Sequence, residues 1–170
     1  LGARVQRHGG VHRTGDGEPA VARPLLRGDR LQAAREAVGL TREELATKLE
    51  LSSPVRIRVW EAGLERPRPR FVPRLAAALG VDPLYLLDVE RDDPPLAALR
   101  LAAGLATNEV TGPGLSVMTY VRLEDGRPGV DPSPKVFAAI SQVLGVDIPR
   151  LEAAVRRSRR DHAATATFQG

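Results

Sequence analysis

The chain has 170 residues, of which 42% are apolar, and it carries a net charge of +4 and no cysteine. Without a thiol it has no disulfide, no cysteine zinc site, no iron–sulfur cluster and no cysteine nucleophile. The three histidines lie near the chain ends, and no stretch approaches the roughly 18 consecutive apolar residues of a membrane helix. We therefore expect a soluble cytoplasmic protein of one or two small domains, with no catalytic residues, no metal site and no cofactor.

The first 28 residues are rich in glycine, arginine and histidine and show no apolar periodicity. This composition predicts a flexible, disordered basic arm over residues 1–28. From Asp29, which we expect to be an N-cap, the pattern becomes helical, with Leu31 and Ala34 among its apolar positions. Gly39 is the expected left-handed residue at the end of this first helix.

Two further helices have clear start signals. Thr41 and Glu44 are spaced as a capping box, in which each side chain bonds the backbone amide of the other residue. Ser53 followed by Pro54 predicts an N-cap with proline at the first helical position, and this third helix is expected to run to Glu61.

The next segments complete a bundle of short helices. Residues 71–79 predict a fourth helix stopped by Gly80, and Asp82 with Pro83 opens a short fifth. Five helices in about sixty residues, with no strand pattern, indicate an all-α domain.

The second half of the chain repeats the first. Three segments recur in the same order, 31–40 as 96–105, 59–63 as 122–126 and 78–82 as 143–147. A repeat of this length indicates two homologous helical domains. Between them, residues 92–95 read Asp-Asp-Pro-Pro, which predicts a hinge because the prolines forbid a continuous helix. We expect domains at 29–91 and 92–160 and a flexible tail at 161–170.

The second and third helices of each copy are separated by a short turn, as in a helix-turn-helix motif. The first copy resembles the DNA-binding domain of lambdoid phage repressors and of bacterial XRE-type regulators. The resemblance rests on Arg35, GLTREELA (39–46), WEAG (60–63) and RPRFVPRLAAALGVDPLYLL (68–87). It implies an all-α fold of two tandem five-helix, repressor-like helix-turn-helix domains.

The resemblance also implies an ion pair between the first helix and the end of the third in each copy. The residues are Arg35 with Glu61 and Arg100 with Glu124. Such a pair holds the third helix at a fixed angle, so these four residues are expected to be structural rather than DNA-reading.

At 100° per residue, Ile57, Trp60 and Glu61 face inward on the third helix. The opposite face carries Val55, Arg56, Arg58 and Val59, with Ser53 at its start. The resemblance implies that this face enters the major groove, where either arginine can bind guanine and the valines can pack on thymine methyl groups. Alternatively, the valines bury a neighbouring element. An apparent one-residue insertion around residues 52–56 leaves the base contacts open.

The loop after the third helix is strongly basic. Between residues 56 and 74 there are six arginines against two acids. Alternating prolines hold this loop extended and remove amide donors. By the resemblance, Arg66, Arg68 and Arg70 contact the DNA backbone or the minor groove, and Arg42 contacts a phosphate. The alternative is a merely solvated charged face.

The second copy departs from this pattern. The sequence Gly-Pro-Gly at 112–114 shortens the segment equivalent to the second helix, and Ala106 replaces the capping threonine. The outward and loop residues that would contact DNA in this copy are Val117, Met118, Val121, Arg122 and Arg127. This largely apolar face suits a divergent half-site reader or a protein-contact module. The basic run at 156–160 is expected near the C-terminus of the last helix, where it favours the helix dipole and could hold phosphates.

These features predict a sequence-specific, nucleoid-associated transcriptional regulator whose partner is double-stranded DNA. The alternative is a helical adaptor in which the second module, or both modules, binds a protein. An enzyme would need a nucleophile, base or metal constellation that the sequence does not offer. Two readers on one chain leave a pseudo-dimeric monomer and a homodimer both open.

Overall fold

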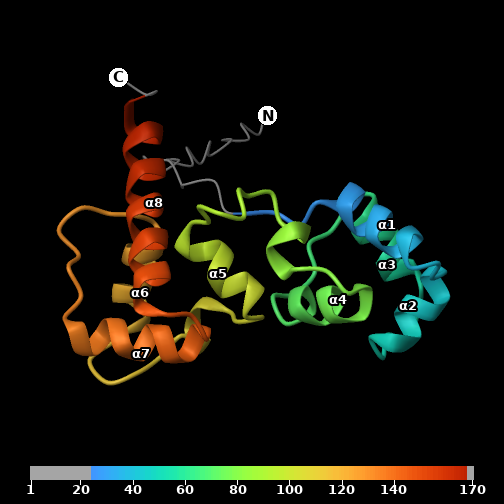
Figure 1. Cartoon of the computed structure of the whole chain (residues 1–170), viewed down its shortest axis with the longest axis horizontal. Helices are drawn as coiled ribbons and strands as arrows, with labels where there is room; N and C mark the ends of the chain where they lie inside the picture. Colours follow the sequence, from blue (N-terminus) through green and yellow to red (C-terminus); the bar gives the residue numbers. More distant parts are fainter. Residues whose placement is uncertain (1–23, 168–170) are drawn as a thin grey trace, which may run out of the picture.

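The computed structural model describes residues 24–167, and this part of the chain has an all-α fold, as predicted (Figure 1). The elements are α1 (Gly28–Ala37), α2 (Arg42–Lys48), α3 (Val55–Glu61), α4 (Phe71–Leu79), the 3-10 helix η1 (Pro83–Leu86), α5 (Leu96–Ala102), the 3-10 helix η2 (Thr107–Glu109), α6 (Val117–Glu124), α7 (Pro134–Leu144) and α8 (Ile148–Thr167). The only β features within residues 24–167 are two isolated bridges. None of the helices of this described part combines the length and apolar character that crossing a bilayer requires.

The residues that contact the first domain include some before residue 29. Leu26 forms an antiparallel bridge with Leu87, and the Arg27 amide donates to the Leu86 carbonyl at 2.8 Å. The prediction of Asp29 as N-cap is therefore wrong, because Arg27 caps α1 and Asp29 lies in its first turn. The expected arm is likewise too long at its C-terminal end, since residues 24–28 are tied to the fold, while its residues 1–23 lie outside the described part.

A close contact explains why α1 begins with glycine. A Cβ on Gly28 would collide with the Glu61 backbone carbonyl at the end of α3. The helix therefore starts where its backbone can approach α3 directly, and this contact fixes one end of α3 against α1.

The start signals of α2 and α3 act nearly as predicted. Thr41 Oγ accepts from the Glu44 amide at 3.1 Å, and the Glu44 carboxylate accepts from the Thr41 amide at 2.8 Å. Ser53 Oγ accepts from the Val55 amide at 3.2 Å, so Pro54 occupies the cap position and Val55, rather than Pro54, is the first helical residue.

The first core is built from one face of each of the first four helices. Trp60 and Phe71 meet at its centre, with their rings 5.2 Å apart. Its large members are Leu31, Leu45, Leu49, Ile57, Trp60, Phe71, Leu75, Leu79 and Leu86. Gly80 ends α4 in the left-handed conformation that the sequence predicted.

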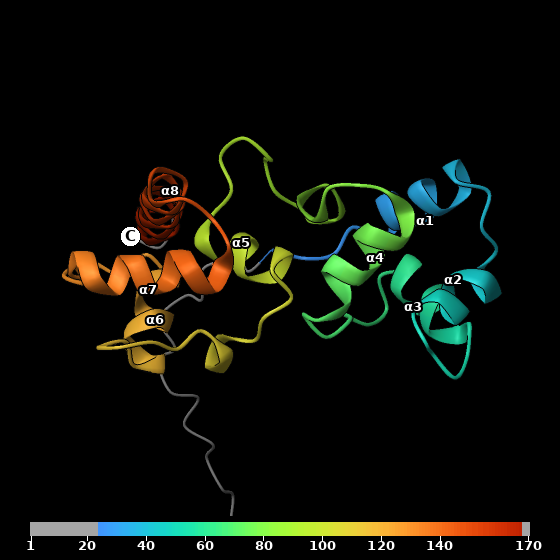
Figure 2. The same ribbon diagram turned by 60° about the horizontal axis from the view of Figure 1, so that its bottom comes forward.

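The second half has its own helices but does not have a separate core. Val72, Leu84 and Leu87 of the first half belong to the same buried cluster as Leu96 and Leu99 of α5. Both views place α5 between α4 on one side and the helices α7 and α8 on the other (Figure 1 and Figure 2). The two halves are therefore joined through a continuous apolar contact.

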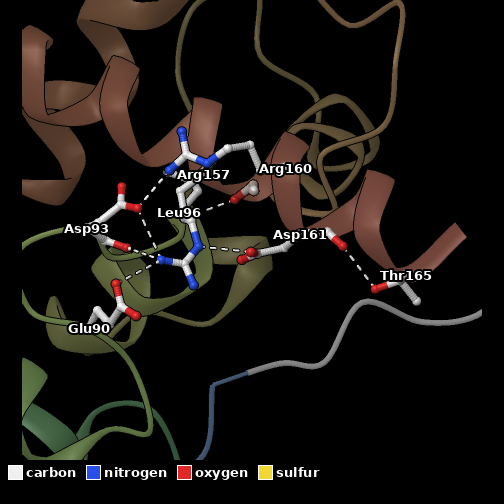
Figure 3. A network of polar contacts seen from close by, with 8 residues as sticks. Glu90, Asp93, Leu96, Arg157, Arg160, Asp161 and Thr165 are labelled. Atoms are coloured by element: carbon white, nitrogen blue, oxygen red, sulfur yellow. Dashed lines mark hydrogen bonds and ion pairs between the residues drawn. The ribbon is translucent and has the colours of Figure 1, made fainter. Parts of the chain in front are cut away.

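Residues 92–95 separate η1 from α5 without a continuous helix, as the two prolines predicted, and polar contacts join this linker to α8. Arg157 and Arg160 of α8 bond the Asp93 carboxylate at 3.1 Å and 2.7 Å (Figure 3). Beside them the Ser158 hydroxyl accepts from the Leu96 amide at 3.1 Å. The linker is thus bonded to α8 at Asp93 and Leu96.

The helix α8 also corrects two expectations about the C-terminal region. It continues to Thr167, so residues 161–167 are helical rather than a flexible tail, and the basic run 156–160 lies in mid-helix. Its arginines serve internal contacts, including an ion pair of Arg159 with Asp131 at 2.7 Å. Three of the four arginines are therefore engaged with acids of the linker, a neighbouring loop or α8 itself.

Candidate nucleic-acid interface

A buried carboxylate anchors α3. Glu61 Oε1 accepts from Arg35 Nε at 2.6 Å, and its other oxygen accepts from Arg42 Nε at 2.7 Å. The Arg35 guanidinium also donates to the Leu40 carbonyl at 2.8 Å, and its hydrogen bond to Glu61 raises its pKa above the ordinary value. Arginines from α1 and α2 thus hold the end of α3, and one of them is the predicted phosphate contact Arg42.

The outward face of α3 is open. Ile57 and Trp60 are buried, as their positions on the helix predicted. Arg56 and Arg58 are exposed, and Val55 is 49% exposed. The remaining two predicted contact residues, Ser53 and Val59, are half-buried. The face therefore offers two guanidinium groups and one uncovered valine side chain, and Val55 does not bury a neighbouring element.

The loop after α3 continues this surface. Arg66, Arg68 and Arg70 are exposed, while the prolines between them are half-buried. The Arg70 guanidinium lies 5.1 Å from the Phe71 ring centre. In the described part of the chain no carboxylate forms an ion pair with any arginine of this surface, namely Arg56, Arg58, Arg66, Arg68 and Arg70. Their charges are thus available to an external anion.

Part of this surface is a depression of about 360 Å³ between the α2–α3 turn and the start of α4. Four guanidinium groups line it, from Arg56, Arg68, Arg70 and Arg74. Arg74 belongs to the basic stretch of the sequence but was not predicted to make a contact. Glu50, the single acid of the lining, was not predicted to belong to the site. We name this depression the arginine pocket.

The second half repeats the anchor but not the basic surface. Arg100 Nε and Nη2 each lie 2.7 Å from an oxygen of Glu124, and Nη1 donates to the Leu105 carbonyl at 2.8 Å. Burial lowers the pKa of Arg100, but the bonds to Glu124 raise it by more, so the pKa lies above its ordinary value. The buried Tyr120 hydroxyl interacts electrostatically with this pair but makes no hydrogen bond of regular geometry.

The outward face of α6 is mainly apolar. Met118 is 61% exposed and Val117 is 39% exposed, whereas Val121 is half-buried. Arg122 is exposed, and Arg127 lies 4.0 Å from Asp125. The segment equivalent to α2 contains only the 3-10 turn η2, where the Glu109 carboxylate accepts from the Ala106 amide at 2.6 Å but alanine offers no reciprocal acceptor.

In residues 24–167 no three side chains of metal-binding type come together. Comparison with protein families matches residues 28–87 to a family described as a helix-turn-helix domain. No significant match was found among curated proteins or among solved structures. The matched segment contains the anchored helix α3, its exposed face and the arginine pocket. Residues 28–87 are therefore similar to helix-turn-helix domains, a kind of domain that characteristically binds DNA.

Proposed function

We propose that the chain is a sequence-specific DNA-binding regulator of transcription of the XRE type. In this proposal α3 enters the major groove and the arginine–proline loop lies along the phosphate backbone and the minor groove. The observation that carries it is the set of five exposed arginines beside α3, none of which is neutralised by a carboxylate in the described part of the chain. An unpaired basic strip next to an exposed helix suits a polyanionic duplex.

Base reading falls to the exposed face of α3. Arg58 is exposed and forms no ion pair, so it can bind guanine O6 and N7 together. Arg56 lies two residues away on the same helix and also borders the arginine pocket, which favours a phosphate for it. Val55 is exposed enough to pack on a thymine methyl group, whereas Val59 is half-buried and contributes less.

Backbone contacts fall to the loop and to α2. Arg66, Arg68 and Arg70 offer unpaired guanidinium groups on an extended segment. Arg42 gives its Nε to Glu61, which leaves its terminal nitrogens for a phosphate. Such contacts fix the position of the domain on the duplex without reading sequence.

We propose that residues 92–160 are a divergent second copy of the domain. The repeated arginine–glutamate anchor supports this, since Arg100 makes the same three kinds of bond as Arg35. Because the halves share a core, α6 is held in a fixed position relative to α3. A pseudo-dimeric monomer then reads two half-sites, while a homodimer would present four such helices.

A second candidate function is protein binding through α6. The exposed Met118 and Val117 favour it, because methionine and valine on a solvent-facing helix suit an apolar partner groove better than a phosphate backbone. In this case the first half binds DNA and the second recruits another protein or a second copy of the chain.

Selection of bound fragments from a random duplex pool tests the proposed function. We expect an enriched sequence, and we expect Arg58→Ala to weaken binding to it by about 1–3 kcal/mol while relaxing the preference at one base pair. Arg122→Ala is the matched change on α6. It weakens a second half-site if α6 reads DNA and has no effect if α6 binds protein. Absence of any enriched sequence would refute sequence-specific binding.

A further inference from the structure

One residue beside the arginine pocket has an unusual backbone conformation. Glu50 has φ of 57°, and it is the only residue other than glycine with positive φ in the described part of the chain. The left-handed region is disfavoured for a residue with a Cβ, and helices that end in it usually place glycine there. The other positive-φ residues include the glycines that follow α1, α3, α4, α5, α6 and α7.

The hydrogen bonds around Glu50 show that the position is a regular helix end. The Leu51 amide donates to the Ala46 carbonyl at 2.9 Å, and the Glu50 amide donates to the Thr47 carbonyl at 3.0 Å. This is the Schellman pattern, in which the residue after the C-cap is left-handed. Glycine would adopt this conformation without strain, whereas glutamate supplies a carboxylate at the strained position.

The side chain of Glu50 points to the arginine pocket. Its Oε2 lies 2.8 Å from Arg74 Nη2, and the same nitrogen donates to the Leu49 carbonyl at 3.0 Å. The side chain is 84% exposed, so the ion pair stands at the rim rather than in the interior. It is the single carboxylate among four guanidinium groups.

We infer that the arginine pocket is a phosphate-binding site and that Glu50 is its internal counterion in the free protein. This inference rests on the proposed function for the source of the phosphate, which is the backbone of duplex DNA. A phosphate that enters the pocket competes with the Glu50 carboxylate for Arg74 and meets repulsion from it. Glu50 therefore weakens the electrostatic part of binding, and its removal strengthens it.

Two substitutions separate the charge of Glu50 from its backbone strain. Glu50→Gln keeps the shape and the strain but removes the charge, and Glu50→Gly removes both. Glu152→Gln, on the exposed surface of α8, is the control for the same change in net charge. Binding is measured by fluorescence anisotropy on a mixed-sequence duplex of about 20 bp, which spans two half-sites. Inorganic pyrophosphate, measured by calorimetry, is the second probe.

We expect both Glu50 variants to bind the duplex about two- to fivefold more tightly than the wild type at about 50 mM salt. The plot of log affinity against log salt becomes steeper, because one more phosphate contact releases counterions. Only Glu50→Gly raises the thermal midpoint, since only glycine relieves the left-handed backbone. Glu152→Gln leaves the duplex affinity within error of the wild type.

The results separate the counterion role of Glu50 from the proposed binding of duplex DNA. If the wild type binds the duplex and Glu50→Gln binds it no more tightly, the counterion inference is wrong and the proposed function stands. If no form binds duplex DNA, the proposed function is wrong. The affinity for pyrophosphate then tests whether the arginine pocket binds phosphate. A gain in pyrophosphate affinity for Glu50→Gln then supports a site for a free phosphorylated ligand, and equal affinities overturn the inference.

Discussion

Glu61→Gln is expected to destabilise the first half of the molecule strongly. The Glu61 side chain is only 2% exposed, and it accepts from Arg35 at 2.6 Å and from Arg42 at 2.7 Å. Glutamine keeps the size but removes the charge and points an amide donor at a guanidinium. The buried Arg35 then has no adequate counterion, which typically costs about 3–5 kcal/mol. The free energy of unfolding of a domain of this size is about 5–15 kcal/mol, so the loss is a large fraction of its stability.

Urea unfolding followed by the fluorescence of Trp60 measures this loss. Trp60 is the only tryptophan, it is buried in the first core, and it directly precedes Glu61. Glu36→Gln is the matched control, because Glu36 lies 3.6 Å from the same Arg35 but is exposed, and a surface pair contributes about 0–1 kcal/mol. If Glu61→Gln cost no more than Glu36→Gln, the anchor role of the buried pair would be refuted.

Three further changes concern the second half. Tyr120→Phe removes a buried hydroxyl that makes no hydrogen bond of regular geometry, so we expect thermal unfolding to show a gain of up to about 1 kcal/mol. A loss would show that the interaction of the hydroxyl with Glu124 and Arg100 stabilises the fold. Burial raises the pKa of Asp93, but the hydrogen bond from Arg157 contributes to a net lowering. The ion pair therefore stabilises the fold above the ordinary carboxyl pKa and is lost as the pH falls through the lowered value. Asp93→Asn should lower the melting temperature at pH 7 and leave it unchanged at a pH below the lowered pKa of Asp93. An equal loss at both pH values would contradict the expected pH dependence of this ion pair. Gly126→Ala places a Cβ against the Ser158 carbonyl at positive φ, and we expect a loss of at least about 3 kcal/mol in urea unfolding, with a near-neutral result excluding the close approach.

The local signals in the sequence predicted the helices well because they depend on neighbouring residues. The capping box of Thr41 and Glu44 and the left-handed Gly80 act within one turn of chain. The shared core was not predictable in the same way. Val72 and Leu84 are buried in the same cluster as Leu99 of α5, and periodicity along one helix does not say which other helix covers its apolar face.

The same distinction applies to the charged residues. Rotation along α3 was enough to predict that Arg56 and Arg58 face outward. Whether an arginine is free depends on acids that are distant in sequence, as for Arg160 and Asp93, which are 67 residues apart. The basic run at 156–160 therefore looked like a phosphate site but largely serves internal ion pairs, and the role of Glu50 required the fold.

In the proposed function the unpaired arginines beside α3 bind duplex DNA, and the salt dependence of binding is the sharpest test of this role. We predict that the wild type binds a duplex with an affinity that falls steeply with salt. Arg68→Ala and Arg70→Ala should each weaken binding on every sequence and reduce the log–log slope by about 0.9. Arg156→Ala, on the exposed side of α8, should leave the slope unchanged. If the wild type had no measurable affinity for duplex DNA, or if the loop variants kept the wild-type affinity and slope, these arginines would not be the DNA-binding residues.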